Sequence, residues 1–119
     1  MNSRRLLLVD DRSDLRMTTA AVLEDAGYEV VEAGSLAEAR GLLVGEPFAA
    51  ALLDVHLGDE SGLDLVAVLR DHHPQAAVVL FTGSAAGHEL GGADAILSKG
   101  IHPEEMVEKV AALIAARRA

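Results

Sequence analysis

The stretch that most constrains the fold is the apolar run of residues 49–53, which ends in the carboxylate of Asp54. Pro47 lies just before the run, and the glycine-containing segment 58–62 follows it. A short aliphatic run between such turn residues is typical of a β-strand that is buried on both faces of a sheet. Asp54 is then expected at the carboxyl edge of that sheet, where ligands bind in open α/β folds.

The same pattern, an apolar run followed by a polar group, recurs along the chain. The runs and their polar groups are residues 6–9 with Asp10 and Asp11, residues 76–81 with Thr82, and the weaker run 93–97 with Lys99. Residues 28–32 form a further short run that contains β-branched residues. With the Asp54 stretch, these runs predict five strands.

Helical periodicity fills the intervals between the predicted strands. The expected helices cover residues 13–26, residues 35 to about 45, residues 63–72, and residues from 103 onward. Ser35 and Glu38 form a capping box, in which each side chain can satisfy a backbone N–H at the start of the second helix. The third helix is expected to end before Pro74, because the residue ahead of a proline is forced out of helical geometry.

Strands that alternate with helices predict a parallel sheet with right-handed crossovers. Five such units in 119 residues suit the flavodoxin-like, doubly wound (βα)5 class of α/β fold, with strand order 2-1-3-4-5 counted along the chain. We expect one domain over residues 1–119. The segment 84–92 is rich in glycine, which disfavours helix by about 1 kcal/mol per residue, so the fourth helix is expected to be short or disordered.

Charge and composition exclude several classes of function. The chain has 19 acidic and 10 basic residues and a formal net charge of −9, which argues against direct binding of nucleic acid or of an anionic membrane. It has no cysteine, so disulfides and thiolate metal sites are excluded. No apolar run approaches the roughly 20 residues that span a bilayer. We therefore expect a cytoplasmic protein.

In the predicted strand order, the strand ends that carry polar groups are neighbours, so their side chains should meet at one edge. Three carboxylates placed close together repel one another unless a cation offsets them. Oxygen ligands of this kind suit Mg²⁺, or another divalent cation such as Mn²⁺. A hydroxyl and an ammonium beside them suit an anion with tetrahedral oxygens. Together these groups are typical of phosphoryl transfer to a carboxylate.

The ordered set of Val9-Asp10-Asp11, Asp54 with Gly62, Thr82 and Lys99 resembles the receiver domain of two-component response regulators, over nearly the whole chain. The resemblance implies that Asp54 accepts a phosphoryl group from a phosphohistidine. It implies that Asp11 ligates Mg²⁺ directly and that Asp10 holds it partly through water. Asp54 and the backbone carbonyl of His56 would supply further oxygen ligands.

The resemblance also implies a switch. Lys99 would pair with the phosphoryl group, and the hydroxyl of Thr82 would move onto a phosphoryl oxygen. The chain departs from the family pattern at three positions: Gly58 and Gly100 stand where the family commonly has proline, and Ile96 stands where it commonly has an aromatic switch residue. The interval from Thr82 to Lys99 is also shorter than usual, and it contributes to the usual output and dimer surface of the family.

By this resemblance the chain is a signalling switch rather than an enzyme, apart from its own phosphorylation and dephosphorylation. Its partners would be a sensor histidine kinase or phosphotransfer protein, a downstream protein or effector domain, and a second copy of the chain if it forms a homodimer. One alternative is a docking module that acts without phosphorylation. A phosphohydrolase with an aspartyl nucleophile is disfavoured, because Asp10 and Asp11 are adjacent and the chain has no room for a cap. A flavin- or nucleotide-binding module is weaker still, since no glycine-rich loop follows the first strand.

Some of these residues have simpler interpretations when taken alone. The pair Asp10-Asp11 without the other groups would more often cap the first helix than bind a metal. Four histidines have no shared metal-ligand spacing and are expected at the surface: His72, His73, His88 and His102. His56 differs by its position beside the site, and we hypothesise that it alters the lifetime of the phosphoryl group.

Overall fold

The computed structural model describes residues 4–83 and 90–118 of the chain. Its main feature is a five-stranded parallel sheet with the order β2-β1-β3-β6-β7. The strands are β1 (Arg5–Val9), β2 (Glu29–Ala33), β3 (Ala50–Asp54), β6 (Ala77–Thr82) and β7 (Ala95–Ser98). This is the predicted doubly wound order, because β6 and β7 are the fourth and fifth strands of the sequence prediction.

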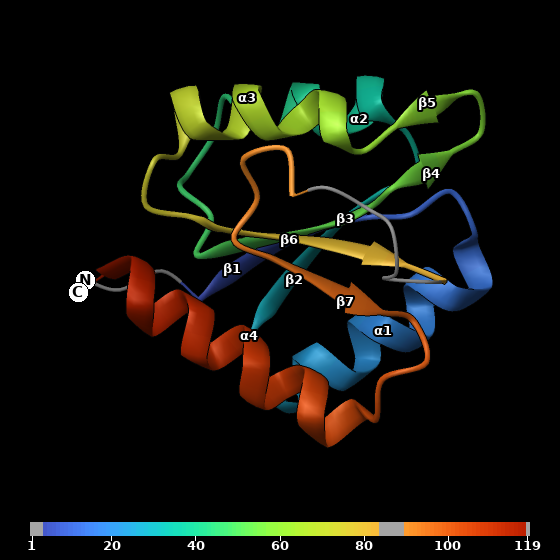
Figure 1. Cartoon of the computed structure of the whole chain (residues 1–119), viewed down its shortest axis with the longest axis vertical. Helices are drawn as coiled ribbons and strands as arrows, with labels where there is room; N and C mark the ends of the chain where they lie inside the picture. Colours follow the sequence, from blue (N-terminus) through green and yellow to red (C-terminus); the bar gives the residue numbers. More distant parts are fainter. Residues whose placement is uncertain (1–3, 84–89, 119) are drawn as a thin grey trace.

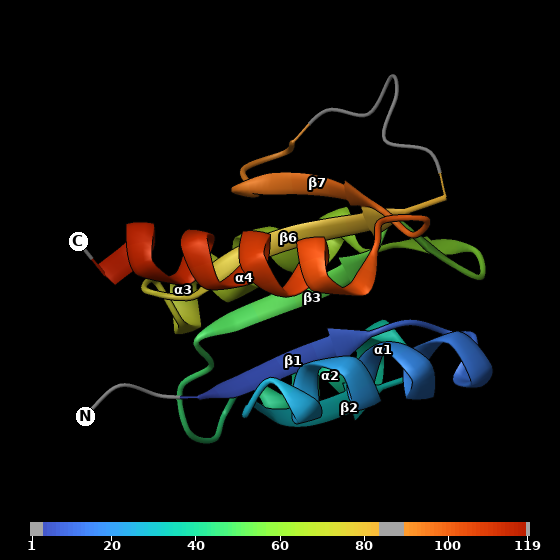
Figure 2. The same cartoon turned by 90° about the horizontal axis from the view of Figure 1, so that it is seen from below.

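Helices cover both faces of the sheet, as Figures 1 and 2 show. The helices are α1 (Ser13–Asp25), α2 (Leu36–Leu42), α3 (Leu63–His72) and α4 (Pro103–Arg118). Helices α2 and α3 lie on one face, and α1 and α4 lie on the other. Alternate residues of β1 divide between the two layers: Leu7 and Val9 belong to the core on the α2 and α3 side, and Leu6 and Leu8 to the core on the α1 and α4 side.

The central strands explain why the apolar runs were recognisable in the sequence. Every residue of β3 and every residue of β6 is buried, so up to the polar residue that ends each strand the sequence is a continuous apolar run instead of an alternating one. Within the described residues, no helix is long and apolar enough to cross a membrane.

The segment after β3 differs from the simple turn that the sequence suggested. It is a small antiparallel hairpin of β4 (His56–Leu57) and β5 (Glu60–Ser61). Gly58, in the turn, has a φ of +59°, a conformation that glycine adopts without steric cost. Strands of two residues carry too little periodicity to be predicted from the sequence.

Helix α2 begins with the predicted capping box, with one difference. The Oγ of Ser35 accepts the N–H of Glu38 at 3.2 Å, and Oε1 of Glu38 accepts the N–H of Gly34 at 2.8 Å, one residue before the cap. The helix ends at Leu42 rather than near residue 45. Helix α3 ends at His72, ahead of Pro74, as predicted.

The expectation that His73 lies at the surface is wrong. Its side chain is buried, with its ring centroid 5.5 Å from that of Phe48. The N–H of Phe48 donates to Nδ1 of His73 at 3.4 Å, so Nε2 donates to the carbonyl of Leu43 at 2.8 Å. The buried histidine thus satisfies two backbone groups in the connection between α2 and β3.

The predicted short fourth helix falls largely outside the described residues, since residues 84–89 are not described. The described chain resumes at Leu90 and packs closely on α3. A Cβ at Gly91 would lie 2.9 Å from Cδ2 of Leu63. Arg70 of α3 donates to the carbonyl of Gly92 at 3.1 Å and to Oδ2 of Asp94 at 2.8 Å.

Candidate functional site

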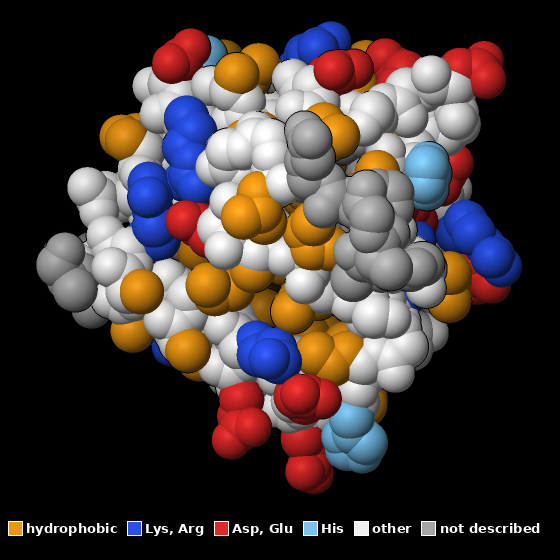
Figure 3. Space-filling view, in the orientation of Figure 1, with side chains coloured by type: hydrophobic (Ala, Val, Ile, Leu, Met, Phe, Trp, Pro, Cys, Tyr) orange, Lys and Arg blue, Asp and Glu red, His pale blue; other side chains and the backbone are white. Residues whose placement is uncertain are grey.

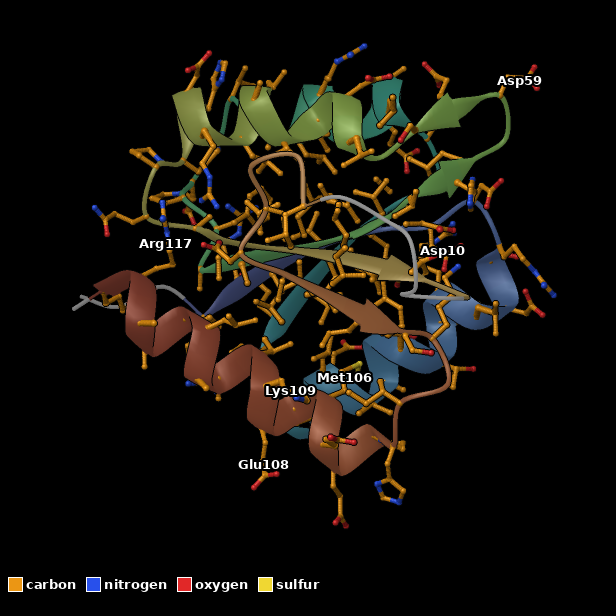
Figure 4. The ribbon with its side chains drawn as sticks, viewed as in Figure 1. Asp10, Asp59, Met106, Glu108, Lys109 and Arg117 are labelled. Atoms are coloured by element: carbon orange, nitrogen blue, oxygen red, sulfur yellow. The ribbon has the colours of Figure 1, made fainter. Side chains whose placement is uncertain are left out.

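The polar groups predicted at the strand ends lie at the carboxyl edge of the sheet. In Figure 4, Asp10 lies at the end toward which the arrows of β6 and β7 point, and Asp59 marks the hairpin beyond it. Arg117 lies at the opposite end. The candidate site is therefore built from the ends of β1, β3, β6 and β7, as expected for a parallel sheet.

Asp54, the last residue of β3, has both carboxylate oxygens held. Its side chain is buried, with the residue only 5% exposed. Oδ2 accepts from Nζ of Lys99 at 2.8 Å, and Oδ1 accepts the backbone N–H of His56 at 3.1 Å. The side chain of His56 is exposed, so this residue contacts Asp54 through its backbone.

Asp10 is also buried and shares the same ammonium. Nζ of Lys99 donates to its Oδ2 at 3.1 Å, and the N–H of Arg12 donates to its Oδ1 at 2.9 Å. Helix α1 has Arg12 as its N-cap residue and no side-chain capping bond. The alternative in which the acidic pair caps this helix is therefore wrong, because the Asp10 side chain closes a turn before the helix instead.

Asp11 is the exposed member of the acidic group. Its Oδ2 accepts the N–H of Gly58 at 3.0 Å, which ties the loop after β1 to the hairpin turn. One carboxylate oxygen from each of Asp10, Asp11 and Asp54 lies within 4.8 Å of the others. The described residues thus bring the predicted carboxylates together at one point.

Lys99 reaches both buried carboxylates from a tight turn after β7. Its N–H donates to the carbonyl of Thr82 at 2.7 Å. Ser98 closes the turn, because its carbonyl accepts the N–H of Ile101 at 3.0 Å and its Oγ accepts the N–H of Gly100 at 3.2 Å. Thr82, the last residue of β6, is 2% exposed and pairs in register with Ser98.

A small cavity of about 40 Å³ lies beside these groups. It is lined by Leu8, Val9, Asp10, Leu15, Thr19, Asp54, Phe81 and Lys99. Ile96 is not among them. It lines a separate hollow of about 270 Å³ between β7 and α4, together with Ala95, Leu97, Lys109, Ala112 and Leu113. Figure 3 shows hydrophobic side chains gathered on this side of the molecule.

Burial and the shared ammonium of Lys99 act on the pKa values of the site in opposite directions. Burial raises the pKa of Asp54, and the charge of Asp10 adds to this, while hydrogen bonds from Lys99 and His56 only partly offset it. Burial lowers the pKa of Lys99, but its hydrogen bonds and charge interactions with Asp54 and Asp10 outweigh burial and raise the pKa overall. Lys99 therefore stays protonated.

The structure explains why glycine is needed at position 62, which the sequence alone did not explain. A Cβ on Gly62 would lie 2.1 Å from the carbonyl oxygen of Asp54, so only glycine leaves room for α3 to start there. The sequence marked Gly62 only through the family pattern. The hydrogen bonds from Arg12 to Asp10 and from Gly100 to Ser98 carried no sequence signal, because each depends on one polar side chain that bonds a nearby backbone N–H.

Comparison with known proteins decides the family. The family model of the response regulator receiver domain matches residues 6–111, which is most of the chain. The chain belongs to this family. The recognition and the fold class predicted from the sequence are thus confirmed.

Individual relatives agree with this assignment. The alginate biosynthesis transcriptional regulatory protein AlgB of Pseudomonas putida is 42% identical over 85 residues, which is 71% of this chain and 19% of that protein. A receiver domain protein (CheY-like) from Methanospirillum hungatei superposes with a TM-score of 0.88 at 29% identity, covering 98% of both chains. A response regulator protein from Burkholderia pseudomallei, solved with a phosphorylated aspartic acid, calcium ion and citrate, gives a TM-score of 0.84 at 32% identity, covering 99% of this chain and 74% of that one.

The similarity to these relatives covers the receiver domain alone. The chain spans about a fifth of the length of the AlgB proteins that it matches. Receiver domains are signalling switches rather than classical enzymes, and their relatives include regulators with further effector domains. Output, partners and the chemistry of individual residues therefore have to be argued from the site.

Proposed function

We propose that this receiver domain is a phosphorylation-dependent switch in which Asp54 accepts a phosphoryl group from a sensor histidine kinase or phosphotransfer protein. The observation that carries the proposal is the position of the Lys99 ammonium, 2.8 Å from Asp54 and 3.1 Å from Asp10. A carboxylate can act as the nucleophile on phosphorus, and the ammonium beside it stabilises the negative charge of the incoming phosphoryl group. The two further acidic groups suit this chemistry only together with a cation that offsets their charge.

In the transfer step, a carboxylate oxygen of Asp54 forms a bond to phosphorus while the N–P bond of the donor phosphohistidine breaks. The electron pair of that bond stays on the imidazole nitrogen of the donor. The N–H of His56 holds Oδ1 of Asp54, which fixes the orientation of the carboxylate. Lys99 is already within hydrogen-bond distance of Oδ2 and can transfer its bond to a phosphoryl oxygen with a small rotation of its side chain.

The residues present suit Mg²⁺, or another divalent cation such as Mn²⁺. Three carboxylates against one ammonium leave an excess of negative charge, and oxygen donors are what a hard cation prefers. Asp10, Asp11, Asp54 and the His56 carbonyl would hold the ion, and the exposure of Asp11 leaves the group accessible from solvent. The bound ion would supply positive charge against the oxygens of the transferred group.

Thr82 and Lys99 would convert phosphorylation into a change of surface. The N–H of Lys99 donates to the carbonyl of Thr82, so a movement of either residue would displace the ends of both β6 and β7. Ile96 lies on β7 beside the hollow against α4 and would follow that movement. A ligand that favours one of two such arrangements shifts the population between them, which is how a partner or effector domain would sense the phosphoryl group.

The proposal is tested by treating the protein with acetyl phosphate and Mg²⁺ and measuring its mass. Wild type is expected to gain one phosphoryl group, and Asp54→Ala none. Asp59→Ala is the matched control, because Asp59 is an exposed aspartate in the adjacent hairpin turn and should leave phosphorylation unchanged. A phosphoryl group on Asp54→Ala would refute the proposed acceptor. An unmodified wild type would favour the alternative docking module.

A further inference from the structure

Asp10 is bonded through all four of its polar atoms to four different parts of the chain. Its carboxylate oxygens accept from Arg12 and Lys99. Its N–H donates to the carbonyl of Ala33, at the end of β2, at 3.1 Å. Its carbonyl accepts from Nη1 of Arg16 at 2.7 Å. The bond from Arg16 differs from the other three because the Arg16 side chain also bonds Glu32, which is not part of the acidic group of the site.

Arg16 lies in α1 and bridges the Asp10 peptide to β2. Its Nε donates to Oε1 of Glu32 at 3.1 Å, while Nη1 donates to Asp10. The two side chains are only 20% and 36% exposed, so the pair is partly shielded from water. A Cβ on Gly34 would lie 3.1 Å from Nη1 of Arg16, so glycine at that position leaves the guanidinium room.

We propose that Arg16, oriented by Glu32, is a positioning residue for the metal site of this domain. It contacts neither the cation nor the phosphoryl group. It fixes the peptide between Asp10 and Asp11, and this keeps the two carboxylates directed toward Asp54. The inference rests on the proposed function, because it assigns part of the Mg²⁺ affinity of the same site.

The planar fork of the guanidinium is what makes the arrangement possible. Its N–H groups point in fixed directions, so one side chain can bond a backbone carbonyl on one side and a carboxylate on the other. A lysine has the same charge but a single nitrogen on a flexible stem, and it cannot reproduce both bonds at these positions. Arg16→Lys therefore separates the geometric contribution of Arg16 from its charge.

Charge alone predicts the opposite result from positioning. Arg16 is a cation near three carboxylates, so by Coulomb's law its removal should strengthen the binding of a second cation. If Arg16 positions the peptide, its removal should weaken that binding, since residues that orient metal ligands typically contribute about 10- to 100-fold in metal affinity. Arg16→Gln therefore distinguishes the two effects by the sign of the change.

The experiment is a Mg²⁺ titration of the intact protein, followed by amide chemical shifts or by calorimetry, together with a urea unfolding curve for each variant. We expect Arg16→Lys and Arg16→Gln each to bind Mg²⁺ about tenfold more weakly than wild type. Glu32→Gln, which leaves Arg16 in place but removes its partner, should fall between them and wild type. Arg40→Gln, which removes an exposed arginine of α2, is the control and should bind Mg²⁺ as wild type does.

The outcomes separate the inference from the proposed function. If wild type takes up no Mg²⁺ at millimolar concentration, the proposed function fails and the inference with it. If wild type binds Mg²⁺ and the folded Arg16 variants bind it equally well or more tightly, only the inference fails. Lower stability with unchanged Mg²⁺ affinity would likewise show that Arg16 supports the fold and not the metal site. Should Arg16→Gln not fold, Arg16→Lys decides between these outcomes, because it keeps the charge and charge alone predicts unchanged Mg²⁺ affinity for it.

Discussion

Replacing Gly62 by alanine is expected to destabilise the fold where α3 meets the end of β3. Gly62 has a φ of −58° and a ψ of −21°, an ordinary right-handed conformation. On backbone preference alone, alanine would therefore stabilise the protein by about 0.4–1 kcal/mol, because it restricts the unfolded chain. The surroundings of Gly62 predict the opposite sign.

The magnitude depends on the contacts that a Cβ would make. It would lie 2.1 Å from the carbonyl oxygen of Asp54 and 3.3 Å from Cβ of Leu53. The first distance is far too short, and the obstacle is backbone that cannot rotate away. The N–H of Gly62 also donates to the carbonyl of Val55 at 3.1 Å, so a shift of the helix start would strain this bond. Forcing an extra methyl group into such a site costs about 1–3 kcal/mol or more.

Urea unfolding followed by far-ultraviolet circular dichroism measures the net effect. With a urea slope of about 1–3 kcal/mol per molar, a loss of about 2 kcal/mol lowers the midpoint by roughly 1 M. Gly41→Ala is the matched control: Gly41 lies within α2, and no atom lies within 4 Å of a Cβ placed there. That variant should be more stable than wild type by about 0.5–1 kcal/mol. A Gly62→Ala midpoint equal to or above that of wild type would refute the reasoning.

Four further substitutions have defined outcomes. Asp54→Asn should raise the unfolding midpoint of the metal-free protein at pH 7, because burial raises the pKa of Asp54 and its charge therefore opposes folding; a lower midpoint would contradict this. Burial alone would raise the pKa of Asp94, but the hydrogen bonds and charges of Arg70 and its other partners lower that pKa overall. The Asp94 carboxylate therefore contributes its full stabilisation above the ordinary pKa of 3.8. This contribution is lost as pH falls through the lower pKa of the folded state. The destabilisation by Asp94→Asn, about 1–3 kcal/mol at about pH 6, should accordingly shrink toward about pH 3, and a pH-independent difference in unfolding curves would oppose this. Asp11→Ala should lose most of the Mg²⁺ affinity in a calorimetric titration, and unchanged uptake would remove Asp11 as a ligand. Lys99→Ala should accept a phosphoryl group slowly and show no change in its amide spectrum; a spectral shift like that of wild type would count against the role of Lys99.

The parts of the fold that could be predicted from the sequence are those that several consecutive residues indicate together. The runs of residues 6–9, 49–53 and 76–81 are apolar throughout because both faces of the corresponding strands are covered. The handedness of crossovers then leaves few strand orders to choose from. The polar residue at the end of each run could be placed directly, since parallel strands end at the same edge.

The start of the last strand shows where such a signal weakens. The run was placed at residues 93–97, whereas β7 begins at Ala95. Asp94 precedes it, and its N–H donates to the carbonyl of Val78 at 2.7 Å. Its side chain accepts the N–H of Val78, also at 2.7 Å. The N–H of Val78 is therefore bonded by the Asp94 side chain instead of by a backbone carbonyl of β7. Hydrophobic periodicity does not show where such a side chain replaces the strand.

Features set by the hydrogen bonds of single polar side chains could not be predicted at all. The burial of His73 depends on the distant backbone groups of Leu43 and Phe48. The turn that aims Lys99 depends on the Oγ of Ser98, which could equally have been a solvated hydroxyl. The sequence indicated which groups meet at the site, and tertiary contacts determine how each one is held.

The way in which these groups are held links the stability of the site to its proposed chemistry. Two buried carboxylates, Asp10 and Asp54, share the one ammonium of Lys99, and Asp11 adds a third negative charge nearby. Burial raises the pKa of Asp54 although Lys99 is bonded to it, so the surrounding fold holds a charged carboxylate where burial disfavours it. A divalent cation would relieve the repulsion, and a phosphoryl group on Asp54 would draw Lys99 away from Asp10. In the proposed switch, these two changes would favour a different arrangement of Lys99, and with it of Thr82 and the ends of β6 and β7, because the N–H of Lys99 is bonded to the carbonyl of Thr82.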